Sequence, residues 1–222
     1  SAVLDSDGEW FEVYNASGYR ADLNGLLIED ASGAAALQLS AALIVEDGDY
    51  AVFARNGDDQ TNGGVIADDT FGFALNNGAD TLTLSNSLGV LDSVGYDSAQ
   101  GWPALPGSSM SLTPGTMDAT SNDDVGSWCL SSSTYGAGDR GTPGAMNDAT
   151  CAYTSCAAIK AADPAATDGV YTIIDDSGAA IDAYCEMDFL GGGWLAVYNM
   201  VHTGNTATEA ANMHAALIQN QD

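Results

Sequence analysis

Acidic side chains, which alternate along residues 5–9 and are adjacent at residues 58–59, come closest in this sequence to a metal-binding pattern. Two oxygen-rich loops carry them, and the residues concerned are Asp5, Asp7, Glu9, Asp58 and Asp59. Calcium takes about six to eight oxygen ligands, and such loops supply the first of them. The spacing departs from that of an EF-hand, because no bidentate acid follows at the twelfth position. The pattern predicts bound Ca²⁺, with acidic turns as the alternative.

Groups that could serve as a nucleophile or a general base are scarce. The two histidines are His202 and His214, and the sequence contains neither an HExxH nor a GxSxG motif. Acidic pairs are plentiful, but none stands in a recognisable arrangement for acid and base catalysis. We therefore expect no catalytic residues and predict that the protein is not an enzyme.

The cysteines indicate disulfides. They are Cys129, Cys151, Cys156 and Cys185. The sequence has no CxxC pair, and neither histidine lies at a zinc-ligand spacing from a cysteine. An even number of cysteines without metal spacing is typical of an oxidising compartment, so we expect an extracellular or cell-surface location. Four cysteines allow three pairings.

The charge balance excludes several classes of partner. The chain has 31 acidic and 4 basic residues, for a formal net charge of −27. Nucleic acid and anionic membranes are expected to be repelled, because their binding needs clustered Lys or Arg. Cationic partners and divalent metals are expected to be attracted. The alternative is that the charge serves solubility in a salty habitat, where screening shortens the Debye length to roughly 3 Å near 1 M salt.

Short apolar runs in the first half predict β-strands. They recur at roughly 8–12-residue spacing with Asn, Asp or Gly turns between them, which is typical of an antiparallel sandwich or barrel. The expected strands are 10–14, 26–28, 37–39, 43–45, 50–54, 71–75, 81–84 and 90–96. Residues 81–84 and 91–94 are expected to form a hairpin, and residues 5–8 a turn. No run approaches 18 apolar residues, so membrane insertion is not expected.

Residues 99–150 are rich in Gly, Ser, Pro and Asp but contain isolated aromatic anchors. We interpret them as an ordered, irregular wrap over the sandwich, with a flexible linker as the alternative. The four tryptophans of the chain could stack on sugars or pack in the interior; they are Trp10, Trp102, Trp128 and Trp194.

Regular elements return after residue 154. A short helix is expected over 155–162, and we expect Asp163-Pro164 to end it. Strands are expected over 170–174, 183–187 and 194–200, the last after a Gly191–Gly193 turn. Residues 206–219 are expected to be helical, because Thr206 and Glu209 have capping-box spacing.

Residues 8–147 resemble the lamin tail domain in its bacterial secreted form. Six ordered blocks carry the resemblance: GEWFEVYN (8–15), DLNG (22–25), DYAVFARN (49–56), DTLTL (80–84), DSVGY (92–96) and GTPGAMN (141–147). The resemblance implies an immunoglobulin-like β-sandwich for residues 1–150. Members usually open with one more strand, so we expect that this chain starts too late to contain it and leaves a sheet edge open for strand addition.

Residues 155–222 resemble the start of a fibrinogen-related domain. The blocks are SC (155–156), GVYTI (169–173), YCEMD (184–188) and GGGW (191–194). The resemblance implies a disulfide between Cys156 and Cys185, which leaves Cys129 and Cys151 as the second pair. The calcium loop and ligand pocket of that family lie in the part of the domain that this sequence does not reach.

Together these patterns predict a mainly β protein with two domains. We expect a lamin-tail-like sandwich over 1–150, then a small disulfide-bonded α+β subdomain over 151–222. The predicted function is an extracellular structural or adhesive module, in one form a self-assembling subunit of a surface fibre or layer. The alternative is a carbohydrate-binding or targeting module of a larger secreted protein. Expected partners are copies of the chain itself, other extracellular proteins or glycans.

Overall fold

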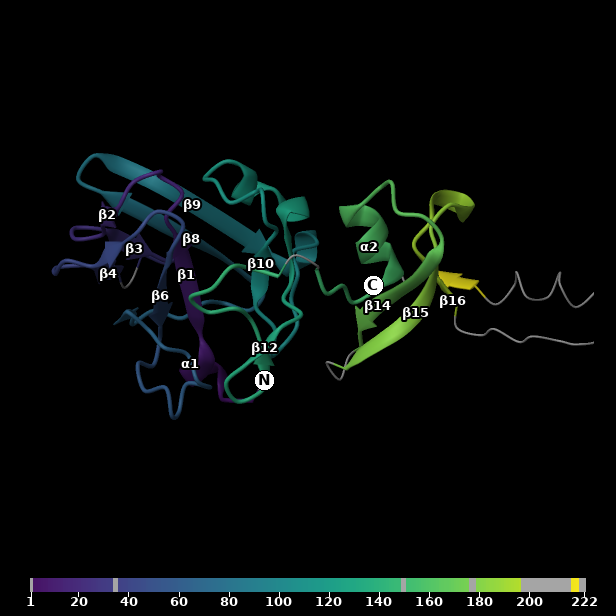
Figure 1. Ribbon diagram of the computed structural model, residues 1–222, viewed down its shortest axis with the longest axis horizontal. Coiled ribbons are helices and arrows are strands. Elements are labelled where there is room, and N and C mark those ends of the chain that lie inside the picture. The colour runs from purple at the N-terminus through teal and green to yellow at the C-terminus, as the bar shows by residue number, and fades with distance from the viewer. Residues whose placement is uncertain (1, 34–35, 149–150, 176–178, 197–216, 220–222) are drawn as a thin grey trace, which may run out of the picture. The chain divides into compact units, whose positions relative to one another are not determined.

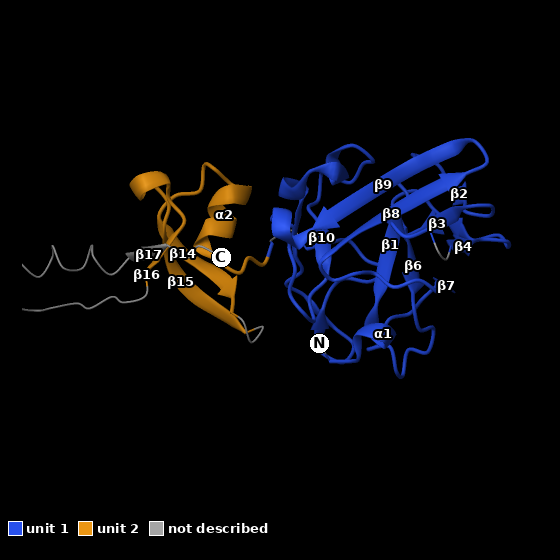
Figure 2. Cartoon of the chain, turned by 180° about the vertical axis from the view of Figure 1, so that it is seen from behind, with its two compact units in different colours: residues 1–151 blue, residues 152–222 orange. Residues whose placement is uncertain are grey.

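The chain divides into two compact units, Ser1–Cys151 and Ala152–Asp222 (Figure 2). The computed structural model describes residues 2–33, 36–148, 151–175, 179–196 and 217–219 (Figure 1). The protein is mainly β, as the sequence predicts, and its first unit is an immunoglobulin-like sandwich.

Two sheets form the framework of the first unit. The smaller sheet has the order β1-β6-β7, in which β1 is antiparallel and β7 parallel to β6. Its strands are β1 (Trp10–Tyr14), β6 (Tyr50–Ala54) and β7 (Asp69–Thr70). The larger sheet is antiparallel with the order β4-β3-β8-β9. Its strands are β3 (Leu27–Glu29), β4 (Ala36–Gln38), β8 (Ala79–Asn86) and β9 (Gly89–Asp97).

Shorter elements complete this unit. The antiparallel pairs are β2 (Ala21–Asp22) with β5 (Ile44–Val45), β10 (Met110–Leu112) with β11 (Trp128–Leu130), and β12 (Thr134–Tyr135) with β13 (Asp139–Arg140). The helical turns are α1 (Asp5–Gly8), η1 (Ser98–Gln100), η2 (Ser121–Asp123) and η3 (Val125–Ser127).

One apolar core joins the inner faces of the two sheets. Phe53 and Ile28 have no exposed surface. Phe11 stacks on Phe53 with ring centroids 5.1 Å apart, and Phe71 and Phe73 extend the aromatic group. Because side chains alternate along β1, Phe11 and Val13 both lie on this face. Burial of each large side chain contributes roughly 1.5–3 kcal/mol.

Strand β6 is buried on both faces. Its outward residues Val52 and Ala54 form a second cluster with Val65, against which Trp10 and Tyr135 pack. The indole N–H of Trp10 donates a hydrogen bond to the Tyr135 hydroxyl at 3.0 Å. The segment after β9 thus supplies an outer layer that covers β1 and β6 on the side away from the sandwich core.

That outer layer is tied down at its end. Asp148 accepts hydrogen bonds from the hydroxyls of Ser131 and Ser133 at 2.6 and 2.5 Å. Burial opposes ionisation of Asp148, but these hydrogen bonds outweigh it and hold the pKa of the carboxyl well below its usual range. A disulfide joins Cys129 to Cys151. The segment is therefore an ordered irregular layer and not a flexible linker.

The second unit packs one helix against an antiparallel sheet. The helix is α2 (Cys156–Ala162), the strands are β14 (Gly169–Ile174), β15 (Ala180–Glu186), β16 (Trp194–Ala196) and β17 (Leu217–Gln219), and η4 (Phe189–Gly191) precedes β16. The Ser155 hydroxyl caps α2 by accepting the N–H of Ala158 at 3.1 Å. The second disulfide, Cys156–Cys185, is fully buried in the core of this unit. Both disulfides have the pairing that the resemblance implies.

The three consecutive glycines have a steric reason. Gly191, Gly192 and Gly193 all have positive φ values, of 97°, 78° and 81°. A Cβ on Gly192 would overlap the backbone of Met187, and one on Gly193 would lie 2.9 Å from the Cα of Ala157. The turn therefore needs glycine both for its backbone angles and for its close approach to α2.

The structure corrects several expected elements. Residues 71–75 are not a strand: Phe71 and Phe73 are buried, but the N–H of Leu75 bonds to the Glu9 carboxylate instead of a neighbouring strand. Residues 5–8 form the helical turn α1. The helix expected over 206–219 is wrong at its end, because residues 217–219 pair with β16 as strand β17. Residues 197–200 and 206–216 lie outside the described residues.

We expect Phe53→Ala to be strongly destabilising. Phe53 is fully buried, so its truncation leaves a cavity that the surrounding core residues can close only in part. The expected loss is about 3–5 kcal/mol in the free energy of unfolding. Leu88→Ala is the control, since Leu88 is 93% exposed. Chemical denaturation measures both, and a similar loss in the two variants would contradict the described core.

Candidate functional site

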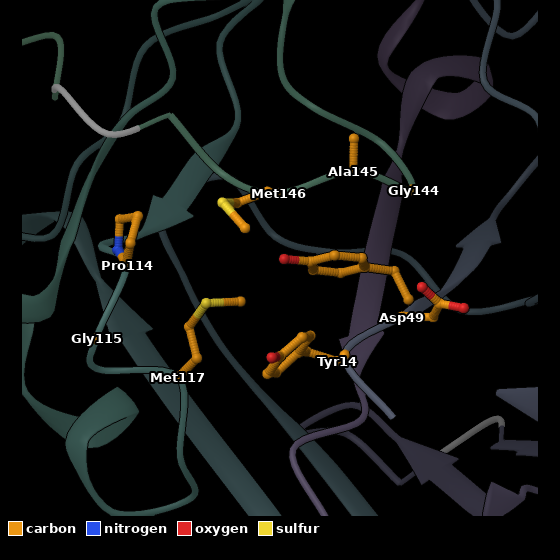
Figure 3. A pocket seen from close by; sticks show the side chains of 10 residues that line it. Tyr14, Asp49, Pro114, Gly115, Met117, Gly144, Ala145 and Met146 are labelled. Atoms are coloured by element: carbon orange, nitrogen blue, oxygen red, sulfur yellow. The ribbon is translucent and has the colours of Figure 1, made fainter. Parts of the chain in front are cut away.

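The first unit carries a cleft of about 370 Å³ on its outer layer (Figure 3). We call it the tyrosine cleft. It is lined by Tyr14, Gly48, Asp49, Tyr50, Pro114, Gly115, Met117, Gly144, Ala145 and Met146. Strands β1 and β6 provide one wall, and two loops of the irregular layer provide the other.

The two tyrosines owe their position to strand register. Tyr14 on β1 lies directly opposite Tyr50 on β6. Their ring centroids are 5.0 Å apart and their planes are tilted by 42°. Because side chains alternate along a strand, both rings lie on the face turned away from the sandwich core. The pair forms an aromatic wall that is only half-buried.

The opposite wall is apolar, and two methionine side chains contribute to it. Met117 and Met146 come from separate loops, and both face the space in front of Tyr14 (Figure 3). Met146 is 73% exposed, and Pro114 is a further apolar residue of the lining. Methionine adapts its shape to a ligand and makes favourable contacts with aromatic rings. Asp49 is the carboxylate in the lining, and it is exposed.

A second carboxylate lies next to the cleft. Glu12 is two residues before Tyr14 on the same face of β1, and it accepts a hydrogen bond from the Gly144 N–H at 2.9 Å. Burial raises the pKa of Glu12 to about 7, and the Gly144 hydrogen bond opposes this only in part. Burial, together with the charges of Glu12 and Tyr14, raises the pKa of Tyr50 to about 12. Glu12 can therefore change its charge near neutral pH.

The first predicted calcium loop is only partly assembled. Glu9 is engaged in an ion pair with Arg55 at 3.0 Å and also accepts the N–H of Leu75. Asp5 accepts a hydrogen bond from the Asn77 side chain at 3.2 Å. Asp5 and Asp7 lie in the first turn of α1, and Glu9 follows it. The three carboxylates thus have separate surroundings.

The second predicted loop uses its carboxylates for hydrogen bonds within the loop itself. Asp58 accepts the N–H of Gln60 at 3.1 Å, and Asp59 accepts the side-chain amide of the same residue. Within the residues that the structure describes, no three His, Cys, Asp or Glu side chains gather as a metal site. Calcium binding at Asp58 and Asp59, as at the first loop, stays a prediction.

The tryptophans pack against neighbours and do not line the cleft. Trp10 meets Tyr135 edge to face, and Trp102 lies 5.8 Å from Trp128 between ring centroids. Trp194 donates its indole N–H to the Phe189 carbonyl at 2.8 Å. All four are half-buried. Each tryptophan thus packs against protein neighbours on one side and keeps part of its surface exposed, and sugar stacking stays untested.

A separate apolar surface lies at the tip of the β8–β9 hairpin. Leu88, Val90 and Leu91 are 93%, 66% and 52% exposed, and we call them the hairpin tip. Strand β9 is the outer strand of its sheet, and no described strand pairs with its free edge. Further along β9, Asp92 accepts a hydrogen bond from Asn122 of η2 at 2.8 Å, so the irregular layer contacts the strand there.

Sequence reasoning missed the tyrosine cleft. The alternation along residues 10–14 and 50–54 predicts the faces of both strands, and the antiparallel register could have paired the tyrosines. Met117 and Met146 had no such signal, because irregular loops bring them to the site. The half-buried state of Glu12 depends on the same loops.

Comparison with known proteins supports the first of the two resemblances. The family model of the Lamin Tail Domain matches residues 2–98. No solved structure matches the chain. The resemblance of residues 155–222 to a fibrinogen-related domain stays a prediction. Among the helices that the structure describes, none is long and apolar enough to cross a bilayer.

We expect Glu12→Gln to change how stability depends on pH. The folded carboxyl keeps its proton up to about pH 7, whereas its ordinary pKa is 4.5. The contribution of Glu12 to stability is therefore complete below about pH 4.5 and is lost as the pH rises through 7. The glutamine variant lacks this loss, so between pH 4.5 and pH 8 the parent should lose about 3 kcal/mol of stability relative to the variant.

Thermal unfolding at pH 4.5 and pH 8 measures this difference. Glu29→Gln on β3 is the matched control, because it removes one negative charge away from the cleft. Parallel pH profiles for the parent and Glu12→Gln would show that Glu12 ionises normally.

Proposed function

We propose that this chain is an extracellular adhesive module that holds a partner in the tyrosine cleft. The observation that carries the proposal is the cleft itself, in which an aromatic pair on rigid strands faces two adaptable methionines. Interaction sites commonly combine rigid aromatic side chains with a contact surface that adjusts. The proposal assigns binding and not catalysis to the chain.

Three further features support an extracellular setting or a binding role. Two disulfides close the irregular layer and the core of the second unit. Such bonds persist in oxidising compartments. The net charge of −27 keeps the chain soluble and favours cationic over anionic partners. The match of residues 2–98 to the lamin tail domain adds an immunoglobulin-like module, a fold that serves many unrelated binding functions.

Self-assembly into a surface fibre or layer is a second candidate function, favoured by the hairpin tip. An exposed apolar edge strand is a template for pairing with another strand. A second copy of the chain offers the same edge, so two copies can pair about a twofold axis into a dimer, and a fibre or layer needs a second contact between such dimers. The charge of −27 opposes this contact at low salt, and screening removes the opposition at high salt.

Adhesion can be measured with beads that carry the full chain. The surfaces are glass coated with poly-lysine, with neutral polysaccharide, with gelatin, or left bare. We expect retention on at least one coated surface, and we expect Tyr50→Ala to lower it about tenfold, because the variant removes half of the aromatic wall. Tyr19→Ala is the matched control, since Tyr19 is 79% exposed and does not line the cleft.

Equal retention of the Tyr50→Ala and parent beads on every surface would overturn the role of the cleft. Retention on the polysaccharide alone would favour the alternative function, a carbohydrate-binding or targeting module. The second unit stays in the chain throughout, so both units are tested as they occur.

Assembly is measured by sedimentation velocity at low salt and near 1 M salt. We expect larger species only at high salt, where the Debye length is roughly 3 Å, and we expect Leu91→Lys to abolish them. Leu4→Lys is the control, because it adds the same charge at another exposed leucine. A monomer at both salt concentrations would rule out assembly through the hairpin tip.

A further inference from the structure

We infer that the tyrosine cleft takes an alkylammonium group, such as a lysine side chain or an N-methylated amine, against Tyr14 and Tyr50. The inference rests on the proposed function and adds the chemical class of the ligand. Three properties of the cleft carry it: the aromatic pair, the thioether wall and the sign of the surrounding charge.

The aromatic pair suits a cation. The face of a tyrosine ring is electron-rich and attracts an ammonium group within about 6 Å of its centroid. With centroids 5.0 Å apart and planes tilted by 42°, Tyr14 and Tyr50 can both lie within that distance of one bound group. The cleft is half-open, so a ligand on a surface or a peptide can reach it without an opening motion.

The methionine wall suits the aliphatic part of such a ligand. Met117 and Met146 face the space before Tyr14 and present methyl and thioether groups (Figure 3). An alkyl chain gains from contact with these groups, whereas a sugar needs several fixed hydrogen-bonding groups. The polar side chains of the lining are the two phenols and Asp49. This lining favours an alkyl chain with one charged end.

The charges around the cleft are negative. Asp49 lines it, and the described part of the chain provides no hydrogen-bond donor to this carboxylate. No Lys or Arg belongs to the lining; Arg55 is paired with Glu9, and Arg20 with Glu46. A cation therefore finds an unneutralised carboxylate, and an anion finds no cationic side chain in the lining with which to pair.

Glu12 couples binding to pH. Tyr14 on its own strand and Tyr50 on β6 are the titratable groups beside it, Asp49 adds a negative charge to the cleft lining, and the irregular layer contributes the backbone N–H of Gly144. A bound cation favours the ionised form of Glu12, so by linkage the ionised form favours the cation. Binding should therefore strengthen as the pH rises through 7.

Choline and its neutral isostere 3,3-dimethyl-1-butanol test the inference, because they share a shape and differ in charge. Titration of the full chain is followed by the methyl NMR signals of Met117 and Met146, with the other four methionines as internal controls. We expect these two signals to move with choline, and choline to bind at least about tenfold more tightly than the alcohol.

Variants separate the contributions. Tyr50→Ala should weaken choline binding about tenfold, Tyr50→Phe should retain it, and Tyr19→Ala should leave it unchanged. Because Tyr50→Phe keeps the ring, it guards against a simple loss of folding in the alanine variant. Glu12→Gln should remove the increase in affinity between pH 6 and pH 8.

Equal binding of choline and the alcohol, or movement of neither methionine signal, would overturn the inference. Its failure is distinguishable from failure of the proposed function. If the cleft holds an uncharged ligand, beads will still be retained on polysaccharide or gelatin in a Tyr50-dependent manner. If the cleft holds nothing, Tyr50→Ala will change neither assay.

Discussion

The burial of strand β6 on both faces is the constraint on which the rest of the first unit depends. Phe53 faces the sandwich core, while Val52 and Ala54 face the outer layer. A five-residue strand with nearly continuous burial needs a second layer, and the irregular segment after β9 provides it. A loop-rich segment can do this because hydrogen bonds satisfy its polar backbone and because Asp148 and a disulfide fix its end.

The same layer explains why the cleft and an unusual carboxyl group occur together. The backbone of Gly144 crosses over β1 close enough to donate to Glu12, and the two residues that follow form part of one wall of the cleft. Covering a strand that carries Glu12 removes water from its side chain, which favours the protonated form. The raised pKa of Glu12 is thus a consequence of the way in which the layer covers and stabilises the sandwich.

Much of the fold was predictable from the sequence, because alternation and turn residues specify strands. Residues 10–14 and 50–54 are strands at the expected bounds, and the hairpin of β8 and β9 is confirmed. The strand predicted over residues 71–75 is wrong, because Phe71 and Phe73 have the same apolar pattern and are buried without a partner strand. The cleft was missed since its loop residues are brought together by contacts between distant segments, which no local pattern encodes.

The two disulfides stand on either side of residues 152–155, since Cys151 closes one loop and Cys156 opens the next. The sequence separations that they bridge are 22 and 29 residues. A pulling force along the chain passes directly through each disulfide and not through the residues between its cysteines. The two enclosed loops, which would span roughly 170 Å when extended, therefore cannot unfold to lengthen the chain. Around this joint the polypeptide would respond to tension as a short, nearly inextensible tether, even after its noncovalent structure had yielded.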